Sequence, residues 1–207
     1  MTYDLRLTTY DLRLTTKLYM RIITGKHRGR KLLECKDFRS LRPTSDKNRE
    51  NLFNVLFSSE KIRHTDFEVE NCNFLDVFCG SGAVALEAIS RGVKSASLID
   101  NNRDHLDLAK ANAQLLKENN LEFFCFDATK PIFKNRQQYN LIFIDPPYYK
   151  NLAATAAINL LEAGWIADNA LIIIEHFLDE NLKALAGKLE LLEQRKYKET
   201  IFSFYKK

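Results

Sequence analysis

The feature that most constrains the fold is a regular alternation of strand and helix patterns that begins near Asn73. Strands are expected near 74–78, 95–100, 121–126, 139–145, 170–176, 188–194 and 199–205. Helices are expected near 82–91, 103–119, 151–162 and 179–186. Strands that alternate with helices form a parallel sheet covered on both faces. The last two strands follow each other without a helix, which predicts an antiparallel C-terminal hairpin. The sequence therefore predicts an α/β, Rossmann-like fold with a seven-stranded, mostly parallel sheet.

Three regions are expected along the chain. Residues 1–19 contain the segment TYDLRLT twice in tandem, and we interpret them as a disordered leader without a function of its own. Residues 20–43 mix short apolar alternation with glycines and basic side chains, which predicts a small hairpin-like appendage. Residues 44–207 form the main domain, and a helix capped near Thr44, Ser45 or Asp46 and running to about residue 57 opens it.

The positive charge is concentrated near one end of the chain. Residues 17–49 hold eleven Lys or Arg against three acids, although the net charge of the whole chain is only +4. A basic segment beside a mildly acidic domain is typical of a protein that binds a phosphate backbone. The alternative is a solvated basic arm without a partner. The candidate phosphate contacts are Arg28, Arg30, Arg42 and Arg49.

Composition excludes several other classes of protein. The chain has no apolar run long enough to span a membrane and no apolar secretory signal. Its four cysteines and four histidines are dispersed, with no C-x-x-C pair, so neither a disulfide framework nor a metal site is indicated. We therefore expect a cytoplasmic protein, and a monomer, without a bound metal.

A glycine-rich turn follows the first strand of the alternating region. Gly80, Ser81 and Gly82 lie between that strand and the next helix, where the backbone can approach a ligand and the helix start attracts negative charge. With Ala85 the turn also fits G-x-G-x-x-A, and Asp100 at the end of the next strand suits ribose hydroxyls. This motif alone fits NAD(P) and S-adenosylmethionine equally well.

Two further carboxylates bear on that choice. Asp76 lies inside the first strand, where it would face the ammonium group of a bound amino-acid moiety, which S-adenosylmethionine has and NAD lacks. Its alternative role is to hold the turn through backbone N–H groups. Asp127 and Ala128 follow the third strand and would contact the adenine of the cofactor, although an Asp there also suits a simple turn.

The motif Asp145-Pro146-Pro147-Tyr148 follows the fourth expected strand. Two prolines end the sheet and fix the backbone, which places Asp145 at the carboxyl edge where such sheets bind ligands. The Asp145 carboxylate and the Pro146 carbonyl would accept the two N–H groups of an exocyclic base amine, and Tyr148 would stack on the base. The alternative is a loop that uses Pro-Pro only as a stop.

These motifs together resemble those of the bacterial 16S rRNA (guanine-N2) methyltransferase family, over about nine-tenths of the chain. The matching segments are MRII at 20–23, RGRKL at 28–32, RPT at 42–44, LFN at 52–54, LDVF at 75–78, GSG at 80–82, EA at 87–88, SRG at 90–92 and DPPY at 145–148. Two features depart from the family pattern: the duplicated leader, and the lack of a glycine near Lys198 in the final hairpin.

The resemblance implies a class I fold and transfer of a methyl group from S-adenosylmethionine to N2 of one guanine in 16S rRNA. The substrate would be the small ribosomal subunit or its assembly intermediate, and the basic segment would bind the RNA. Asp145 would be the catalytic residue. The cofactor would be held by Asp76, Gly80, Gly82, Asp100 and Asp127.

Other functions remain open on the sequence. A methyltransferase of DNA or of another RNA, acting on an exocyclic amine, shares the motif, but the chain has no room for a large target-recognition insert. A protein glutamine methyltransferase would carry Asn in place of Asp145. An NAD(P)-binding oxidoreductase leaves the Asp-Pro-Pro-Tyr motif unexplained, and an RNA-binding module without catalysis explains only the basic segment.

Overall fold

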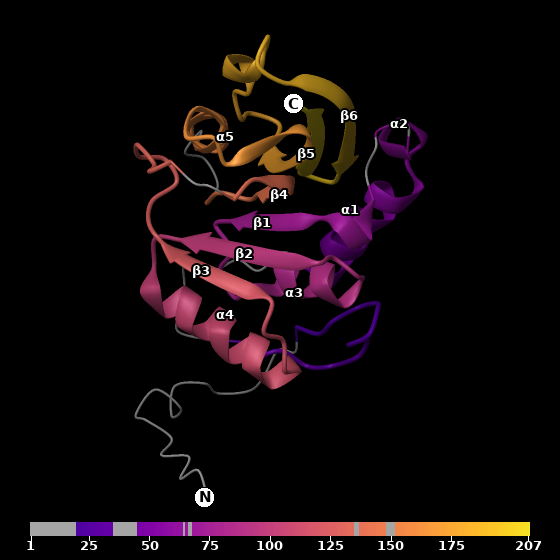
Figure 1. The fold of residues 1–207 in the computed structure, drawn as a ribbon. Helices are drawn as coiled ribbons and strands as arrows, with labels where there is room; N and C mark the ends of the chain where they lie inside the picture. The colour runs from indigo at the N-terminus through magenta and orange to yellow at the C-terminus, as the bar shows by residue number, and fades with distance from the viewer. Residues whose placement is uncertain (1–19, 35–44, 64, 66–67, 135–136, 148–151) are drawn as a thin grey trace, which may run out of the picture.

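A computed structural model of the chain describes residues 20–34, 45–63, 65, 68–134, 137–147 and 152–207. One seven-stranded sheet runs through it in the order β3-β2-β1-β4-β5-β7-β6 (Figure 1). The strands are β1 (Asn73–Val77), β2 (Ser95–Asp100), β3 (Leu121–Cys125), β4 (Tyr139–Ile144), β5 (Ile166–Phe177), β6 (Glu190–Tyr197) and β7 (Thr200–Lys206). The first five are parallel, and β7 pairs antiparallel with both β5 and β6. The predicted mostly parallel sheet with an antiparallel C-terminal hairpin is confirmed.

The helices also follow the predicted alternation, with one exception. They are α1 (Asp46–Ser58), α2 (Glu60–Arg63), α3 (Ala83–Ser90), α4 (Arg103–Leu116) and α5 (Ala153–Glu162), with short 3-10 turns η1 (Val69–Asn71) and η2 (Lys183–Leu185). Ser45 caps α1 by accepting a hydrogen bond from Asn48 N–H at 3.1 Å. The prediction of a helix at 179–186 is wrong, because only the short turn η2 forms there. Leu185 is the one buried side chain of that segment, so a longer helix would have no apolar face to pack.

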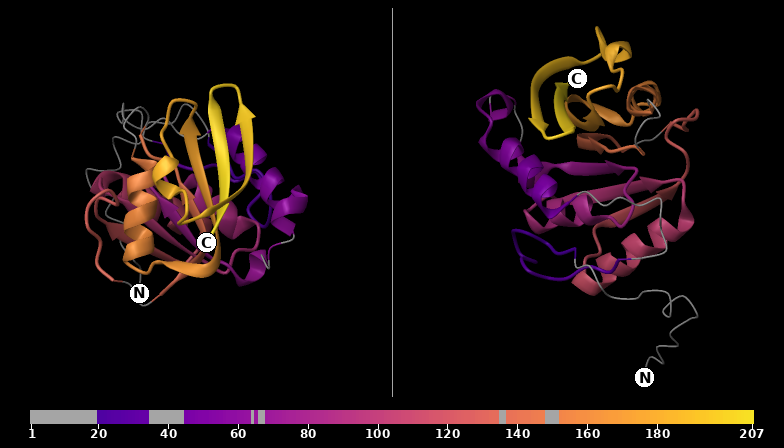
Figure 2. Two further views of the ribbon diagram at one scale, coloured as in Figure 1. Left: turned by 90° about the horizontal axis from the view of Figure 1, so that it is seen from above. Right: turned by 180° about the vertical axis from the view of Figure 1, so that it is seen from behind.

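The sheet separates two hydrophobic layers. Helices α1, α3 and α4 cover one face, over strand residues such as Phe74, Leu98 and Phe143. Helix α5 covers the other face, over residues such as Val77 and Ile144 (Figure 2). Successive side chains of a strand point to opposite faces, so the apolar runs of these strands supply both layers at once. Among the described residues, no helix is both long and apolar enough to cross a membrane.

Residues 20–34 fold back on themselves and pack against the main domain. Arg21 forms an antiparallel bridge with Lys31, and Leu32 N–H donates to the Met20 carbonyl at 2.8 Å. Met20, Ile22 and Leu32 are buried against apolar side chains of α3 and α4. We call residues 20–34 the N-terminal hairpin. Figure 1 shows it as the indigo loop next to α3 and α4.

Polar groups of α3 fix the tip of the N-terminal hairpin. Glu87 is fully buried, and its carboxylate accepts from Ile23 N–H at 2.7 Å and Thr24 N–H at 3.0 Å. The Ser90 carbonyl accepts from Lys26 N–H at 2.8 Å. Gly25 has φ +84°, and a Cβ there would lie 1.8 Å from the Ser90 carbonyl oxygen, so no other residue fits. The tip of the hairpin is thus held through its backbone N–H groups, in addition to the packing of Met20, Ile22 and Leu32.

The turn between β6 and β7 forms without the glycine that the family pattern favours. Tyr197 pairs with Thr200, which leaves a two-residue loop. Lys198 adopts φ 58°, in the left-handed region that glycine enters without steric cost. The tight hairpin is therefore kept, with some backbone strain at Lys198.

Candidate active site

Four carboxyl groups lie on one face of the sheet, near the carboxyl ends of four neighbouring strands. Asp100 ends β2, Asp76 lies in β1, Asp145 follows β4 and Glu175 lies in β5. In each strand the residue two positions earlier belongs to the layer under α1, α3 and α4, so the carboxyl side chains share that face. This edge of a parallel sheet is where ligands of α/β proteins bind.

The glycine-rich turn follows β1 directly. Cys79 N–H donates to the Ile99 carbonyl of β2 at 3.0 Å, and Phe78, Gly80 and Gly82 all have positive φ angles. A positive φ at an aromatic residue such as Phe78 is rare and strained, and such strain is concentrated at functional sites. A Cβ at Gly82 would lie 2.9 Å from Leu98 Cδ2 and 3.0 Å from a carbon of α4. Gly82 therefore allows α3 to start close to the sheet.

Asp76 is buried, with 2% of its surface exposed. Its Oδ2 accepts from Ala85 N–H in the first turn of α3 at 3.1 Å, so it does hold the turn through a backbone N–H group. Burial raises the pKa of Asp76 to about 8, and the nearby Asp145 and Asp100 carboxylates contribute to that shift. A carboxyl group with such a pKa gains stability when a cation comes to it. The geometry is therefore compatible with both roles that the sequence left open.

Asp100 connects the glycine-rich turn to the start of α4. Its Oδ2 accepts from Gly80 N–H at 3.0 Å, and its Oδ1 accepts from Asn102 N–H at 2.9 Å. The ring nitrogen Nδ1 of His105 lies 3.2 Å from the same Oδ1. Each carboxylate oxygen has two lone pairs, so Asp100 retains capacity to accept from ribose hydroxyls.

The structure places the other predicted cofactor residues as follows. The Ser81 hydroxyl is buried and contacts Met20 Sδ of the N-terminal hairpin at 3.9 Å. Asp127 Oδ1 accepts from Thr129 N–H at 2.9 Å and from the Thr129 hydroxyl at 2.6 Å. The hydrogen bond from the hydroxyl is the main reason that the pKa of Asp127 is lowered. Ala128 is buried, and its carbonyl accepts from Asn159 Nδ2 at 3.0 Å. Asp127 and Ala128 follow β3 at the same sheet edge, while Ser81 faces the hairpin.

The Asp-Pro-Pro segment leaves the sheet at the end of β4. Asp145 N–H donates to the Val77 carbonyl at 3.3 Å, which places Asp145 next to the end of β1. The Asp145 side chain is partly exposed, Pro146 is buried and Pro147 is exposed. Tyr148 lies outside the described residues. The rigid backbone thus holds a solvent-accessible carboxylate between β1 and β5.

Sequence reasoning missed Glu175. Only 1% of its surface is exposed, and its Oε1 accepts a long hydrogen bond of 3.5 Å from Asn48 Nδ2 of α1. Burial raises the pKa of Glu175 well above its usual value, and the Asp145 carboxylate adds to the shift. Its signal in the sequence is a single acid within the run LIIIEHF. Such an acid is unusual in a strand that is buried on both faces.

The predicted RNA contacts fall into three groups. Arg28 and Arg30 are exposed on the N-terminal hairpin, and Arg42 lies outside the described residues. Arg49 is not a surface residue, so the prediction that it contacts phosphate is wrong. Its guanidinium is fully buried and donates to the Arg21 carbonyl at 2.8 Å and to Asp46 at 2.7 Å. Burial lowers its pKa, against the opposing effect of Asp46 and Glu87.

Comparison with known proteins places the chain in a family. The family model described as Conserved hypothetical protein 95 matches residues 20–206. The chain belongs to this family. Ribosomal RNA small subunit methyltransferase D of Escherichia coli K12 is 34% identical over 189 residues, which cover 91% of this chain and 90% of that protein. The protein of the same name from Haemophilus influenzae is 33% identical over 167 residues, which cover 79% of this chain and 81% of that protein.

Solved structures agree with membership of the Conserved hypothetical protein 95 family. The putative methyltransferase yhhF from Escherichia coli has a TM-score of 0.76 and 32% sequence identity, and the match covers 91% of this chain and 98% of that one. The N-methyltransferase NodS from Bradyrhizobium japonicum shares the fold at a TM-score of 0.59, with 14% identity and coverage of 79% of this chain and 87% of that one. The fold is that of the class I S-adenosylmethionine-dependent methyltransferases.

Proposed function

We propose that the chain is an S-adenosylmethionine-dependent methyltransferase that modifies N2 of a guanine in small-subunit ribosomal RNA. One observation carries the proposal: the rigid Asp145-Pro146 segment lies directly beside the glycine-rich turn at the carboxyl edge of the sheet. Relatives over most of the chain are named as methyltransferases of small-subunit ribosomal RNA, which supports this substrate. We propose a cytoplasmic location, since ribosomal subunits are assembled there in bacteria.

The residues at the edge of β1, β2 and β3 fit the proposed cofactor. Bound S-adenosylmethionine supplies a methyl group that its positively charged sulfur already activates. Asp76 offers a buried carboxyl group to the ammonium, and Gly80 lets the backbone approach. Asp100 accepts from the ribose hydroxyls, and Asp127 accepts from the adenine amino group. The buried Asp76 supports this fit, because burial raises its pKa to about 8 and a bound ammonium group would stabilise the charged form of the carboxyl group.

Asp145 then acts on the accepting amine. The lone pair of an exocyclic amine is delocalised into the base, which makes the amine a poor nucleophile. When the Asp145 carboxylate and the Pro146 carbonyl accept its two N–H groups, the lone pair is turned toward the methyl donor. Fixing both reactants in such a geometry can contribute about 7–11 kcal/mol to lowering the barrier. The two prolines provide that fixation, since they restrict the backbone on which Asp145 is carried.

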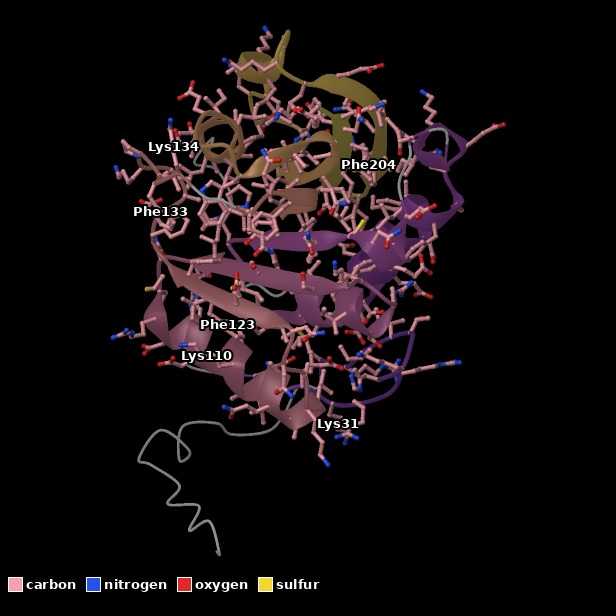
Figure 3. The ribbon with its side chains drawn as sticks, viewed as in Figure 1. Lys31, Lys110, Phe123, Phe133, Lys134 and Phe204 are labelled. Carbon is pink, nitrogen blue, oxygen red and sulfur yellow. The ribbon has the colours of Figure 1, made fainter. Side chains whose placement is uncertain are left out.

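The N-terminal hairpin provides the cations for RNA. Lys26, Arg28, Arg30 and Lys31 are all exposed on it, and Figure 3 shows Lys31 extending outward from the domain. Arg30 also donates to the Leu115 carbonyl at the end of α4 at 3.2 Å, which fixes its direction. Contacts of this kind neutralise phosphates without reading sequence. The hairpin therefore gives affinity for RNA, and the groups around Asp145 select the base.

The proposed function is tested by methyl incorporation from labelled S-adenosylmethionine. Three substrates are compared: unmodified small ribosomal subunits, naked small-subunit RNA and duplex DNA. We expect label in one or both ribosomal substrates, recovered as N2-methylguanine after digestion to nucleosides. Label found only in DNA, or at a base other than guanine, would contradict the proposal.

Cofactor binding should depend on pH through Asp76. At pH 6 to 7.5 the Asp76 carboxyl of the free protein is mostly neutral, because its pKa is about 8. The cofactor ammonium favours the ionised form, so binding releases a proton. Affinity for S-adenosylhomocysteine, which keeps the ammonium, should therefore rise with pH by up to about tenfold per unit until pH reaches about 8. Calorimetry in two buffers of different ionisation enthalpy measures both the affinity and the released proton.

Variants of two aspartates make this pH test specific. Asp76→Asn removes the titrating group and should flatten the rise in affinity while weakening binding at pH 7.5. Asp168→Asn is the matched control. Asp168 lies near the start of β5, away from the carboxyl edge, and its side chain is 94% exposed although it pairs with Lys207. A wild-type affinity that stays constant from pH 6 to 7.5 would show that Asp76 does not face the ammonium.

A further inference from the structure

Glu175 is a buried acid that the proposed methyl transfer does not yet use. Ile144, the last residue of β4, pairs with Ile174 of β5, so Asp145 and Glu175 are the next residues along two neighbouring segments. The two side chains lie on the same face of the sheet. Glu175 is therefore the neighbour of the proposed catalytic carboxylate.

One oxygen of Glu175 has no hydrogen-bond partner among the described residues. Oε1 accepts the long hydrogen bond from Asn48, whereas Oε2 is buried and accepts from no group in the part of the chain that the structure describes. Leaving a buried acceptor unsatisfied costs about 1–3 kcal/mol. Burial also raises the pKa of Glu175, because it disfavours the charged form of the acid. A buried carboxyl oxygen without a partner in the described structure is available to accept from a donor that arrives with a ligand.

The position of Glu175 indicates which ligand that is. The candidate cofactor residues Asp76, Asp100 and Asp127 lie on or directly after β1, β2 and β3, on one side of Asp145. Glu175 lies in β5, on the other side. Methyl transfer is an in-line displacement, so the accepting base must approach Asp145 from the side opposite the cofactor. Glu175 is thus placed next to the base.

We propose that Glu175 determines specificity for guanine by accepting a hydrogen bond from the ring N1–H at its free Oε2. This inference rests on the proposed function, because it assigns a role at the same site. In guanine the exocyclic amine is flanked by N1–H, whereas the amines of adenine and cytosine are flanked by a ring nitrogen without hydrogen. A base whose amine is held by Asp145 therefore presents a donor to Glu175 only when it is guanine.

Comparison of guanine with 2-aminopurine tests the role of Glu175. 2-Aminopurine keeps the amine on C2 but has no hydrogen on N1. The probe is small-subunit RNA, in the form that accepts label, with either base at the position that the wild-type enzyme methylates. The wild-type enzyme should prefer guanine by about 10–100-fold in kcat/KM, the size of effect expected when a buried acceptor loses its donor.

Three substitutions distinguish recognition from structure. Glu175→Leu keeps much of the volume, suits the Ile-rich strand and should fold, because the acid that it removes makes only a long hydrogen bond at Oε1 and has a buried, unsatisfied Oε2 within the described structure. It should reduce the reaction with guanine by about 10–100-fold and leave the reaction with 2-aminopurine within about threefold, so the preference is lost. Glu175→Gln retains an acceptor and should keep most of the preference. Glu193→Ala, which changes a mostly buried acid in β6 that contacts Ser59 and Arg195, should leave the preference unchanged.

The outcomes separate this inference from the proposed function. If Glu175→Leu slows both bases equally, or keeps the wild-type preference, Glu175 does not read N1–H and only this inference fails. If the wild-type enzyme methylates neither ribosomal substrate, the proposed function fails and the inference fails with it. Loss of the guanine preference in Glu175→Leu but not in Glu175→Gln would establish the assignment.

Discussion

Asp145→Ala should reduce methyl transfer by about 10²–10⁴-fold, the range associated with a positioned acid or base in the transition state. The variant loses the carboxylate that turns the amine toward the methyl donor, while Pro146 and Pro147 still hold the backbone. Because Asp145 touches the acceptor and not the cofactor in this mechanism, affinity for S-adenosylhomocysteine should change by less than about threefold. Single-turnover transfer into ribosomal substrate and calorimetry with S-adenosylhomocysteine measure the two quantities separately.

Two results would revise this role for Asp145. Equal loss of cofactor binding and turnover would place Asp145 among the cofactor contacts instead. Near-normal turnover would remove it from the mechanism altogether. Asp168→Ala is the matched control, because it deletes an exposed carboxylate at the opposite end of β5 and should leave both quantities unchanged.

Glu87→Ala should lower the free energy of unfolding by about 3–5 kcal/mol, the cost of removing one partner from a buried ion pair. The Glu87 carboxylate accepts from two backbone N–H groups of the N-terminal hairpin and from Arg91 Nε at 2.7 Å. Arg91 is itself nearly buried, and its guanidinium lies 4.6 Å from the centre of the Phe53 ring. The substitution therefore leaves a buried cation and two N–H groups without their acceptor.

Denaturant unfolding and hydrogen exchange together measure the effect of Glu87→Ala. The amides of Ile23 and Thr24 should lose their protection first, because the carboxylate is their acceptor. Glu162→Ala on α5, which changes an exposed acid, should stay within about 0.5 kcal/mol of wild type. The contrary result would be a decrease in the free energy of unfolding of less than about 1 kcal/mol in Glu87→Ala, with the Ile23 and Thr24 amides still protected. The hairpin would then be held mainly by the packing of Met20, Ile22 and Leu32.

Local sequence pattern was sufficient for most elements of the fold but not for their order. Each strand from β1 to β7 is a short apolar or alternating run, and each helix between them has an apolar face, so both kinds of element could be located. The pairing of β1 with β4, and the insertion of β7 between β5 and β6, arise from contacts between distant segments. The helix predicted at 179–186 failed because Leu185 alone is buried there, and a pattern over eight residues does not show what it packs against.

The candidate site was predictable where glycine, proline or an acid interrupts an apolar pattern at the end of a strand. That signal located Gly80, Asp100 and Asp145. It did not predict that the Asp100 carboxylate accepts hydrogen bonds from the backbone N–H groups of Gly80 and Asn102. Arg49 was assigned wrongly from the local density of positive charge. Arg49 is three and four residues before the buried Leu52 and Phe53, which places it on the apolar face of α1. This helical spacing indicates the burial of Arg49 better than the local density of charge does. Glu175 was overlooked because a single acid in an Ile-rich strand is dominated by the core pattern around it.

The anchored N-terminal hairpin has a consequence for the kinetics of the RNA binding that we propose for it. Its backbone is tied to α3 and α4 through Glu87, Ser90 and Asn112, so the backbone that carries its cations is ordered before any RNA is present. A flexible arm loses conformational entropy when it binds, whereas this loop loses it when the protein folds. Encounter with RNA then requires no ordering of the loop, and long-range attraction can set the association rate directly. That rate should fall steeply with ionic strength, without the large heat-capacity change of coupled folding and binding.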